Sequence, residues 1–422
     1  MHLSTMFEWL SWIGSVHISE IELGLDRIKK VAARLDLLSP TCKVIIVGGT
    51  NGKGSTVAGL ESIYRAAGYH VGIFTSPILF KHNEQVKIDG HEASDDQFCH
   101  AFENIEGVRG DITLTPFEFH TLAALFIFKQ YSLDLVILEV GLGGRLDAVN
   151  IIDADIAIVT SIAIDHVDWL GSTREAIAFE KAGIFRSGKP AICGDLDPPI
   201  SLHEHAHASG SPFFCQGVDF KYQANKNTWS WVSEKIEYTD LPRNSLMSQN
   251  MSTVLMAITL LQPALPVTRA AIENGLRNIC IIGRVQIIPG AITHIYDVSH
   301  NPEAVAHLAS RLNETKQSGQ TFAVFSMLAD KDITESIKNI ATEIDEWYVA
   351  PLSVKRAATI ETLEEIFVRV NIQKVNFFSS IEIAYKNAVQ NATPGDRIII
   401  FGSFHTVASA FAILNPRAHM ST

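Results

Sequence analysis

A glycine-rich stretch near the N-terminus, VIIVGGTNGKGSTV at residues 44–57, has the residue types of a phosphate-binding loop. It departs from the usual G-x-x-x-x-G-K-[ST] pattern, because Val47 stands where the first glycine belongs and Gly54 follows the lysine. Backbone amides at the start of a helix nonetheless bind anions, and Lys53 adds a positive charge suited to the β- and γ-phosphates. The alternative interpretation is a glycine turn that carries a surface lysine.

Three more polar side chains each follow a separate predicted strand: Ser76, Glu139 and His166. In an open α/β sheet, ligands bind outside the carboxyl ends of the strands, so we expect these residues and Lys53 to face one crevice. Hydroxyl, carboxylate and imidazole groups suit Mg²⁺ whose shell is completed by phosphate oxygens. Taken singly, Glu139 is equally compatible with a buried ion pair, His166 with a loop histidine and Ser76 with a turn before proline.

Two other patterns are weaker. The sequence GLGG at residues 141–144 resembles a dinucleotide fingerprint, but no suitable helix is predicted after it, so NAD binding is not expected. His203, His205 and His207 alternate after Asp-Pro-Pro, and we expect them on an exposed helix rather than around a metal ion.

The elements that must position these residues alternate between helix and strand. Apolar strands are predicted at residues 43–49, 70–76, 133–141, 155–162 and 189–193, and helices at 19–38, 54–69, 115–132 and 173–185. A helix and short antiparallel strands are predicted between about 195 and 250, and a further helix at 250–262.

A second alternation of strand and helix begins at residue 291. Alternating apolar strands and helices predict a mainly parallel sheet that is covered on both faces. The predicted fold class is therefore α/β. A P-loop ATPase-like domain is expected over residues 1–287, and a smaller Rossmann-like domain over residues 288–422.

Composition narrows the class of protein further. The 422 residues carry a formal net charge of −12 and 47% hydrophobic residues, which argues against a nucleic-acid binder and for sizeable buried cores. Five cysteines without a C-x-x-C pair favour reduced thiols. The N-terminus lacks a basic signal-peptide region, and no uncharged apolar run is long enough for a membrane helix. We expect a cytoplasmic monomer that binds neither membranes nor nucleic acid.

Ten motifs occur along the chain in a fixed order: GTNGKGS, TSP, LTPFE, LEVGLGGRLDAVN, SIAIDHVDWLG, EKAGIFRSGKP, GRVQI, YDVSHNP, MLADKDI and FGSFHTVA. Together they resemble the dihydrofolate synthase/folylpolyglutamate synthase family of the Mur ligase superfamily, over nearly the whole chain. LTPFE is similar to the bifunctional bacterial branch rather than to a folylpolyglutamate synthase alone. Pro116, Ile78 and the sequence IIGR depart from the family pattern, which affects the pterin site rather than the phosphate and metal residues.

The resemblance implies a set of ATP and metal contacts. The residues matching the ATP-phosphate loop are Thr50, Asn51, Gly52, Lys53, Gly54 and Ser55, and further ATP contacts match Asn250, Arg284 and Asp297. One Mg²⁺ is implied at Ser76 and Glu139, so that Ser76 supplies the hydroxyl that usually follows the loop lysine. A second Mg²⁺ is implied at His166 and at Lys181, the lysine that relatives carry as a carbamate. From the residues alone, Lys181 would be an ordinary lysine on a helix surface.

The resemblance also implies where the substrates bind. A pterin site is implied at Thr115, Pro116, Phe117 and Glu118, with Leu146, Asp147 and Ala148 beside them. The glutamate end of the reaction is implied near His300 and Ser403. The residues implied in the chemistry itself are Lys53, Glu139, His166, Lys181 and His300.

The implied reaction is amide formation, in which ATP phosphorylates a carboxylate and the amine of L-glutamate displaces the phosphate. The expected substrates are 7,8-dihydropteroate, giving dihydrofolate, and the γ-carboxylate of reduced folates. The expected cofactors are ATP and two Mg²⁺ ions, with a monovalent cation as a further candidate. The alternatives are a folylpolyglutamate synthase alone, a UDP-muramoyl amino-acid ligase, a regulatory P-loop NTPase and a non-catalytic α/β protein.

Overall fold

The computed structural model describes residues 3–19, 21–279, 281–315 and 318–414. The chain divides into two compact units, residues 1–280 and 281–422. The boundary predicted between residues 287 and 288 falls inside β12 (Gln286–Ile288). Because β12 pairs antiparallel with β13 (Thr293–Tyr296), backbone hydrogen bonds assign it to the second unit, and the structural division comes earlier than predicted.

The first unit is built on an eight-stranded sheet in the order β4-β3-β2-β5-β1-β6-β7-β8. The strands from β2 to β8 in this order are parallel to their neighbours, whereas β3 and β4 are antiparallel at one edge. The bounds are β1 Lys43–Gly48, β2 Val71–Phe74, β3 Val86–Ile88, β4 His91–Glu92, β5 Leu135–Glu139, β6 Ile156–Val159, β7 Ala191–Cys193 and β8 Phe213–Cys215.

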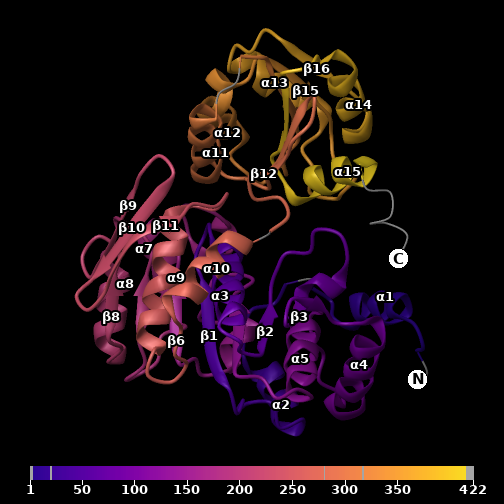
Figure 1. The fold of residues 1–422 in the computed structure, drawn as a ribbon. Coiled ribbons are helices and arrows are strands. Elements are labelled where there is room, and N and C mark those ends of the chain that lie inside the picture. The colour runs from indigo at the N-terminus through magenta and orange to yellow at the C-terminus, as the bar shows by residue number, and fades with distance from the viewer. Residues whose placement is uncertain (1–2, 20, 280, 316–317, 415–422) are drawn as a thin grey trace. The chain divides into compact units, whose positions relative to one another are not determined.

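Helices cover both faces of this sheet (Figure 1). Helix α3 lies against β1, β2 and β5 and is packed between α9 and α10, while α5 lies against β2 and contacts α1, α2 and α4. The bounds are α1 Met6–Val16, α2 Asp26–Arg34, α3 Lys53–Ala66, α4 Asp95–Arg109, α5 Pro116–Lys129, α6 Val167–Leu170, α7 Arg174–Ala182, α8 Ile200–Ser209, α9 Ser248–Leu261 and α10 Arg269–Asn278. Two short 3₁₀ helices are η1 (His82–Gln85) and η2 (Ala148–Ile151).

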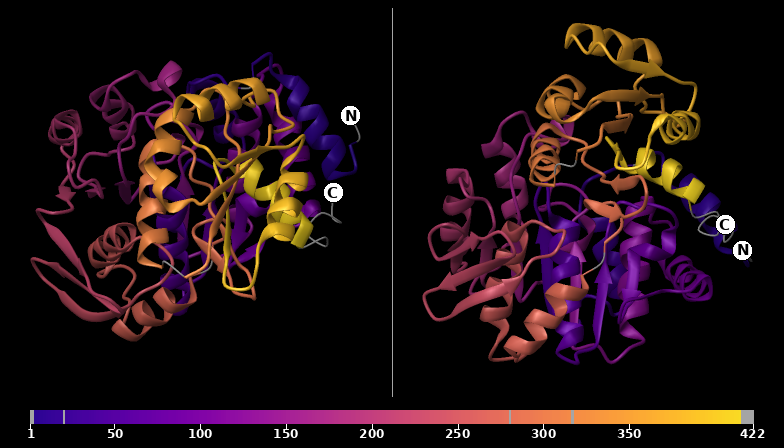
Figure 2. Two further views of the ribbon diagram at one scale, coloured as in Figure 1. Left: turned by 90° about the horizontal axis from the view of Figure 1, so that it is seen from above. Right: turned by 45° about the horizontal axis from the view of Figure 1, so that its top comes forward.

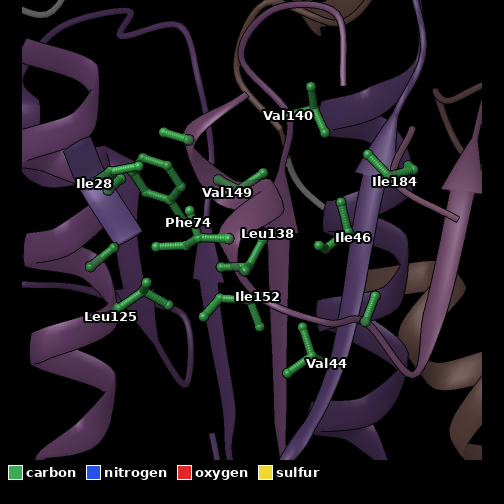
Figure 3. Close-up of a cluster of buried hydrophobic side chains, with 14 of the residues drawn as sticks. Ile28, Val44, Ile46, Phe74, Leu125, Leu138, Val140, Val149, Ile152 and Ile184 are labelled. Carbon is green, nitrogen blue, oxygen red and sulfur yellow. The ribbon is translucent and has the colours of Figure 1, made fainter. Parts of the chain in front are cut away.

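One hydrophobic core of the first unit lies on the sheet face covered by α2 and α5 (Figure 3). Ile46 and Leu138 project from the two central strands and are fully buried, and Leu125 of α5 and Ile28 of α2 close over them. Burying one such side chain contributes roughly 1.5–3 kcal/mol. The core therefore fixes the strands whose carboxyl ends carry the predicted site residues.

A separate three-stranded antiparallel sheet also belongs to the first unit, as the sequence predicted. Its order is β11-β10-β9, and its strands are β9 Phe220–Ala224, β10 Thr228–Ser233 and β11 Glu237–Pro242.

The second unit is a six-stranded sheet in the order β12-β13-β17-β14-β15-β16, with all neighbours parallel except β12. Helices lie on both sides of it (Figures 1 and 2), as predicted for a Rossmann-like domain. The remaining bounds are α11 Pro302–Glu314, β14 Thr321–Phe325, α12 Ile333–Ile340, η3 Ala341–Glu343, β15 Glu346–Val349, α13 Ile360–Arg369, β16 Val375–Phe377, α14 Ile381–Asn391, β17 Arg397–Phe401 and α15 Phe404–Leu414.

The helix predicted at residues 19–38 is wrong at its start. Helix α2 begins at Asp26, and its N-cap Leu25 makes no side-chain cap hydrogen bond. Gly24 has φ 155°, and its amide donates to the Leu146 carbonyl at 3.4 Å, so a tertiary contact holds this segment outside the helix. Helices α1 and α4 were not predicted, although both begin with capping boxes, at Thr5 and at Ser94.

The structure bears on two expectations from composition, which concern membrane helices and reduced cysteines. In the described part of the chain, no helix combines the length and the apolar character needed to cross a bilayer. The cysteines at 42, 99, 193 and 215 are free thiols. Cys280 lies outside the described residues.

The core makes a testable prediction about stability. We expect Ile46→Ala to lower the free energy of unfolding of the first unit by about 2–5 kcal/mol, because Ile46 is fully buried and truncation leaves a cavity. Ile18→Ala is the matched control, since Ile18 is fully exposed, and it should have little effect. Urea unfolding followed by circular dichroism measures both variants. Equal losses would contradict the assignment of this core.

Candidate active site

The predicted site residues occupy one edge of the first sheet. Lys53 follows β1, Ser76 follows β2, Glu139 ends β5 and His166 follows β6. These strands are adjacent and parallel, in the order β2-β5-β1-β6, so their carboxyl ends lie along the same edge. The sheet topology therefore brings together the four segments that the sequence predicted to converge.

The phosphate loop, residues 49–55, leads directly into α3. Gly52 is the N-cap with φ 86°, and the helix begins at Lys53, one residue before the predicted start. The Lys53 ammonium donates to the carbonyls of Gly49 at 3.0 Å and Thr50 at 3.2 Å. A Cβ at position 52 would lie 2.5 Å from Asn250 Oδ1, so the predicted ATP contact Asn250, from α9, lies against this loop.

The phosphate loop is bonded to the segment that follows β6, residues 160–166, called the β6 loop. The Thr50 amide donates to the Ser161 carbonyl at 2.7 Å, and Thr50 Oγ1 accepts from the Ala163 amide at 3.1 Å. Thr160 Oγ1 donates to the Asn51 carbonyl at 2.6 Å. Sequence reasoning missed the roles of Thr160 and Ser161. The only signal for them was a pair of hydroxyl residues directly after a buried strand.

The predicted metal residues form two small groups. The Ser76 amide donates to the buried carboxylate of Glu139 at 3.2 Å, which fixes this serine beside the carboxylate. His166 has φ 50°, and its Nε2 lies 3.9 Å from Asp165 Oδ2. Among the described residues, no three His, Cys, Asp or Glu side chains are grouped so as to hold a metal ion. A cation here would therefore need the serine hydroxyl, phosphate oxygens and water as further ligands.

Lys181 is buried, whereas the residues alone would have placed it as an ordinary lysine on a helix surface. It lies on α7 with 4% of its surface exposed. Burial and, after it, the charge of Lys53 lower the pKa of Lys181 to about 7, although Asp165 and Asp147 oppose the drop. A Cβ at Gly144 would lie 3.0 Å from Lys181 Cα, and the Gly144 carbonyl accepts the Asp147 amide at 3.1 Å, so Lys181 lies beside the turn that carries Asp147. A buried amine with this pKa is about half uncharged at pH 7 and becomes increasingly uncharged above it.

The predicted pterin segment forms the start of α5. Thr115 is the N-cap, and Glu118 completes a capping box by accepting the Thr115 amide at 2.8 Å. Glu118 Oε1 also accepts from Arg27 at 3.3 Å, so both oxygens have protein partners, and burial raises the pKa of this carboxyl. Phe117 packs on Phe74 with ring centroids 5.7 Å apart. A Cβ at Gly141 would lie 2.6 Å from the Phe117 ring, which explains glycine there.

Asp147 organises the second predicted pterin segment. Its carboxylate accepts the amides of Leu142 at 2.8 Å and Val149 at 3.0 Å. Burial raises the pKa of Asp147 to about 6, although these backbone donors and Lys53 oppose the rise. Leu146 and Ala148 flank it. Asp147 therefore holds the turn after β5 in shape and places a carboxyl group near the loop lysine.

The second unit contains its own group of predicted residues. Arg284 and His300 both face Phe404, with the guanidinium carbon 5.4 Å and the imidazole centroid 5.9 Å from the ring centroid. Asp297 accepts the Val285 amide at 2.8 Å. Ser403 is buried, and its hydroxyl is hydrogen-bonded to the Thr406 hydroxyl at the start of α15.

Two family models match this combination of fold and site. The Mur ligase middle domain matches residues 47–238, and the Mur ligase glutamate ligase domain matches residues 283–404. The class that the fold and the site define is thus the Mur ligases.

Relatives that align over nearly the whole chain identify the family within the Mur ligases. The dihydrofolate synthase/folylpolyglutamate synthase of Escherichia coli (strain K12) is 42% identical and covers 98% of this chain and 96% of its own length. That of Haemophilus influenzae is 39% identical, with 97% and 98% covered. The crystal structure of Escherichia coli FolC with DHPP and ADP has a TM-score of 0.94 at 42% identity, and 98% of each chain is covered.

A second solved structure extends this agreement. The Yersinia pestis bifunctional folylpolyglutamate synthase/dihydrofolate synthase with AMPPNP and Mn has a TM-score of 0.92 at 44% identity, covering 97% of this chain and 98% of its own. The chain belongs to the dihydrofolate synthase/folylpolyglutamate synthase family.

The phosphate loop makes a prediction for nucleotide binding. We expect Gly52→Ala to abolish measurable ADP binding while the protein still folds, because the added Cβ would collide with Asn250 and the backbone has φ 86°. Gly107→Ala is the matched control, since a Cβ in this part of α4 meets no atom within 4 Å. Isothermal titration calorimetry with ADP and Mg²⁺ measures both. Unchanged affinity in Gly52→Ala would contradict this loop as the nucleotide site.

Proposed function

We propose that the protein joins L-glutamate to 7,8-dihydropteroate, giving dihydrofolate, and adds glutamate to the γ-carboxylate of reduced folates. The observation that carries this proposal is the convergence of Lys53, Ser76, Glu139 and His166 at the carboxyl ends of four adjacent parallel strands, in a chain of this family. Relatives named dihydrofolate synthase/folylpolyglutamate synthase support both activities.

The proposed chemistry begins with activation of the carboxylate. A carboxylate oxygen of the pterin substrate attacks the γ-phosphorus of ATP, and ADP leaves. The glutamate nitrogen then attacks the acyl carbon, phosphate leaves and the nitrogen loses a proton. The backbone amides of the phosphate loop and Lys53 offset the charge on the transferred phosphoryl group, so the contribution of the chain is positioning and electrostatics.

The proposed cofactors are ATP and two divalent cations. The donor set fits this number: Ser76 and Glu139 would hold one ion, and His166 and Lys181 the other. Bound Mg²⁺ would neutralise phosphate charge and orient the oxygens. The lowered pKa of Lys181 fits carbamate formation, in which the uncharged amine attacks carbon dioxide and loses a proton. A monovalent cation remains a candidate cofactor without assigned ligands.

On the substrate side, Phe117 packs on the pterin ring and Asp147 accepts its N–H groups, because each carboxylate oxygen has a second lone pair beyond its backbone donor. The other residues of the two pterin segments shape the pocket around the ring, with Glu118 orienting the helix start. Contacts to ATP come from Asn250, Arg284 and Asp297, and His300 and Ser403 lie at the glutamate end. The proposed enzyme is a cytoplasmic monomer whose partners are small molecules.

The proposed function is tested by measuring ADP release from purified protein. We expect release only when glutamate is present together with dihydropteroate or a reduced folate. Release with reduced folates but not with dihydropteroate would restrict the protein to folylpolyglutamate synthesis. Release with UDP-muramoyl peptides would favour a cell-wall ligase, and release that needs no glutamate would favour a regulatory NTPase.

The proposal that Ser76, and not Ser55, supplies a hydroxyl ligand to Mg²⁺ makes a prediction for these two serines. We expect Ser76→Ala to raise the Mg²⁺ concentration needed for half-maximal ADP release by about tenfold. The loss of one ligand should weaken the binding of the cation by about 1 kcal/mol or more. Ser55→Ala should change it less, because Ser55 is buried in the first turn of α3. A magnesium titration of both variants decides between them. A larger shift in Ser55→Ala would refute the assignment of Ser76.

A further inference from the structure

An ion pair outside the predicted site fixes the backbone of Ile162 from both sides. The Asp195 carboxylate accepts the Ile162 amide at 2.8 Å, and Arg174 Nε donates to the Ile162 carbonyl at 2.9 Å. Arg174 Nη2 also donates to both oxygens of Asp195, at 3.2 and 3.3 Å. Asp195 follows β7 and is buried, and Arg174 begins α7. One peptide segment is thus held by a guanidinium and a carboxylate at once.

Ile162 lies at the centre of the β6 loop. Its neighbours Ser161 and Ala163 are the residues that bond Thr50, through the Ser161 carbonyl at 2.7 Å and the Ala163 amide at 3.1 Å. The position of Ile162 therefore sets how the phosphate loop lies against the β6 loop. Hydrogen bonds on both sides leave the segment little freedom to shift along its own direction.

The same segment leads to the proposed metal residues. The β6 loop ends in Asp165 and His166, and α7, which Arg174 begins, carries Lys181 in its last turn. A displacement at Ile162 would therefore reach the phosphate loop and the proposed ligands of the second cation together. A 1 Å misplacement of a positioned group can cost a factor of about 100 in rate.

We propose that Arg174 and Asp195 are positioning residues for nucleotide and metal binding, which act through Ile162. This inference rests on the proposed function of the phosphate loop. Both partners hydrogen-bond the backbone of Ile162, so the loss of either should lower nucleotide affinity. Because the Asp195 side chain is only 10% exposed, urea unfolding of each variant is measured as well, to separate this effect from a loss of stability.

The test compares Arg174→Gln with wild type by calorimetric titration of ADP with Mg²⁺. We expect affinity to fall by about tenfold, because a hydrogen bond to a charged group is worth roughly a factor of ten or more. The KM for ATP should rise in parallel, while the KM for the pterin substrate stays unchanged. Asp195→Asn should weaken ADP similarly, and the double variant should be no weaker than either single one, since both residues act through Ile162.

Arg109→Gln is the matched control. Arg109 ends α4, donates to the carbonyls of Gly110 and Ile112 at 3.0 Å and pairs with Glu106, so it loses similar contacts without touching the β6 loop. Its ADP affinity should equal that of wild type. If wild type binds no ADP, the proposed function fails. If wild type binds ADP but Arg174→Gln binds it equally well, or Arg109→Gln is weakened equally, the positioning role is overturned. Should Arg174→Gln fail to fold, Asp195→Asn carries the same comparison.

Discussion

The candidate active site depends on the register between two loops that are far apart in the sequence. The phosphate loop follows β1 and the β6 loop follows β6, and hydrogen bonds of the Thr50 amide and the Thr50 hydroxyl join them. Their approach is close enough that a Cβ at Gly49 would lie 1.9 Å from Thr160 Oγ1, so only glycine fits there. Because β1 and β6 are adjacent parallel strands, the sheet core and the loop register define one structural unit.

Electrostatics shapes the same unit. The charge of Lys53 disfavours charge on Lys181, and Asp165 and Asp147 offset part of this repulsion. A buried amine beside the half-buried Lys53 is costly without an anion, whereas a nucleotide triphosphate or a carbamate would change the balance. The arrangement is therefore better understood as complementary to bound anions and cations than as a device for stability.

Sequence reasoning placed the residues that follow a strand and failed where a contact came from elsewhere. Alternating strands and helices were enough to put Lys53, Glu139 and His166 at one sheet edge, because topology alone decides which strand ends are neighbours. The burial of Lys181 could not be predicted, since a lysine on an amphipathic helix is ordinarily solvated. Likewise, Asn250 faces Gly52 only because α9 packs on α3, and no local pattern encodes that packing.

The departure of the loop from the usual phosphate pattern has a physical explanation in this geometry. In the usual pattern the residue after the lysine supplies a hydroxyl to the cation. Here that position is Gly54, and the next hydroxyl, on Ser55, is buried in the first turn of α3. Ser76, by contrast, follows the strand beside β5 and is bonded through its amide to Glu139. A short loop can therefore serve nucleotide binding if the hydroxyl and the carboxylate both come from neighbouring strands. The relative positions of these groups are therefore set by the order of the strands in the sheet and not by the loop alone.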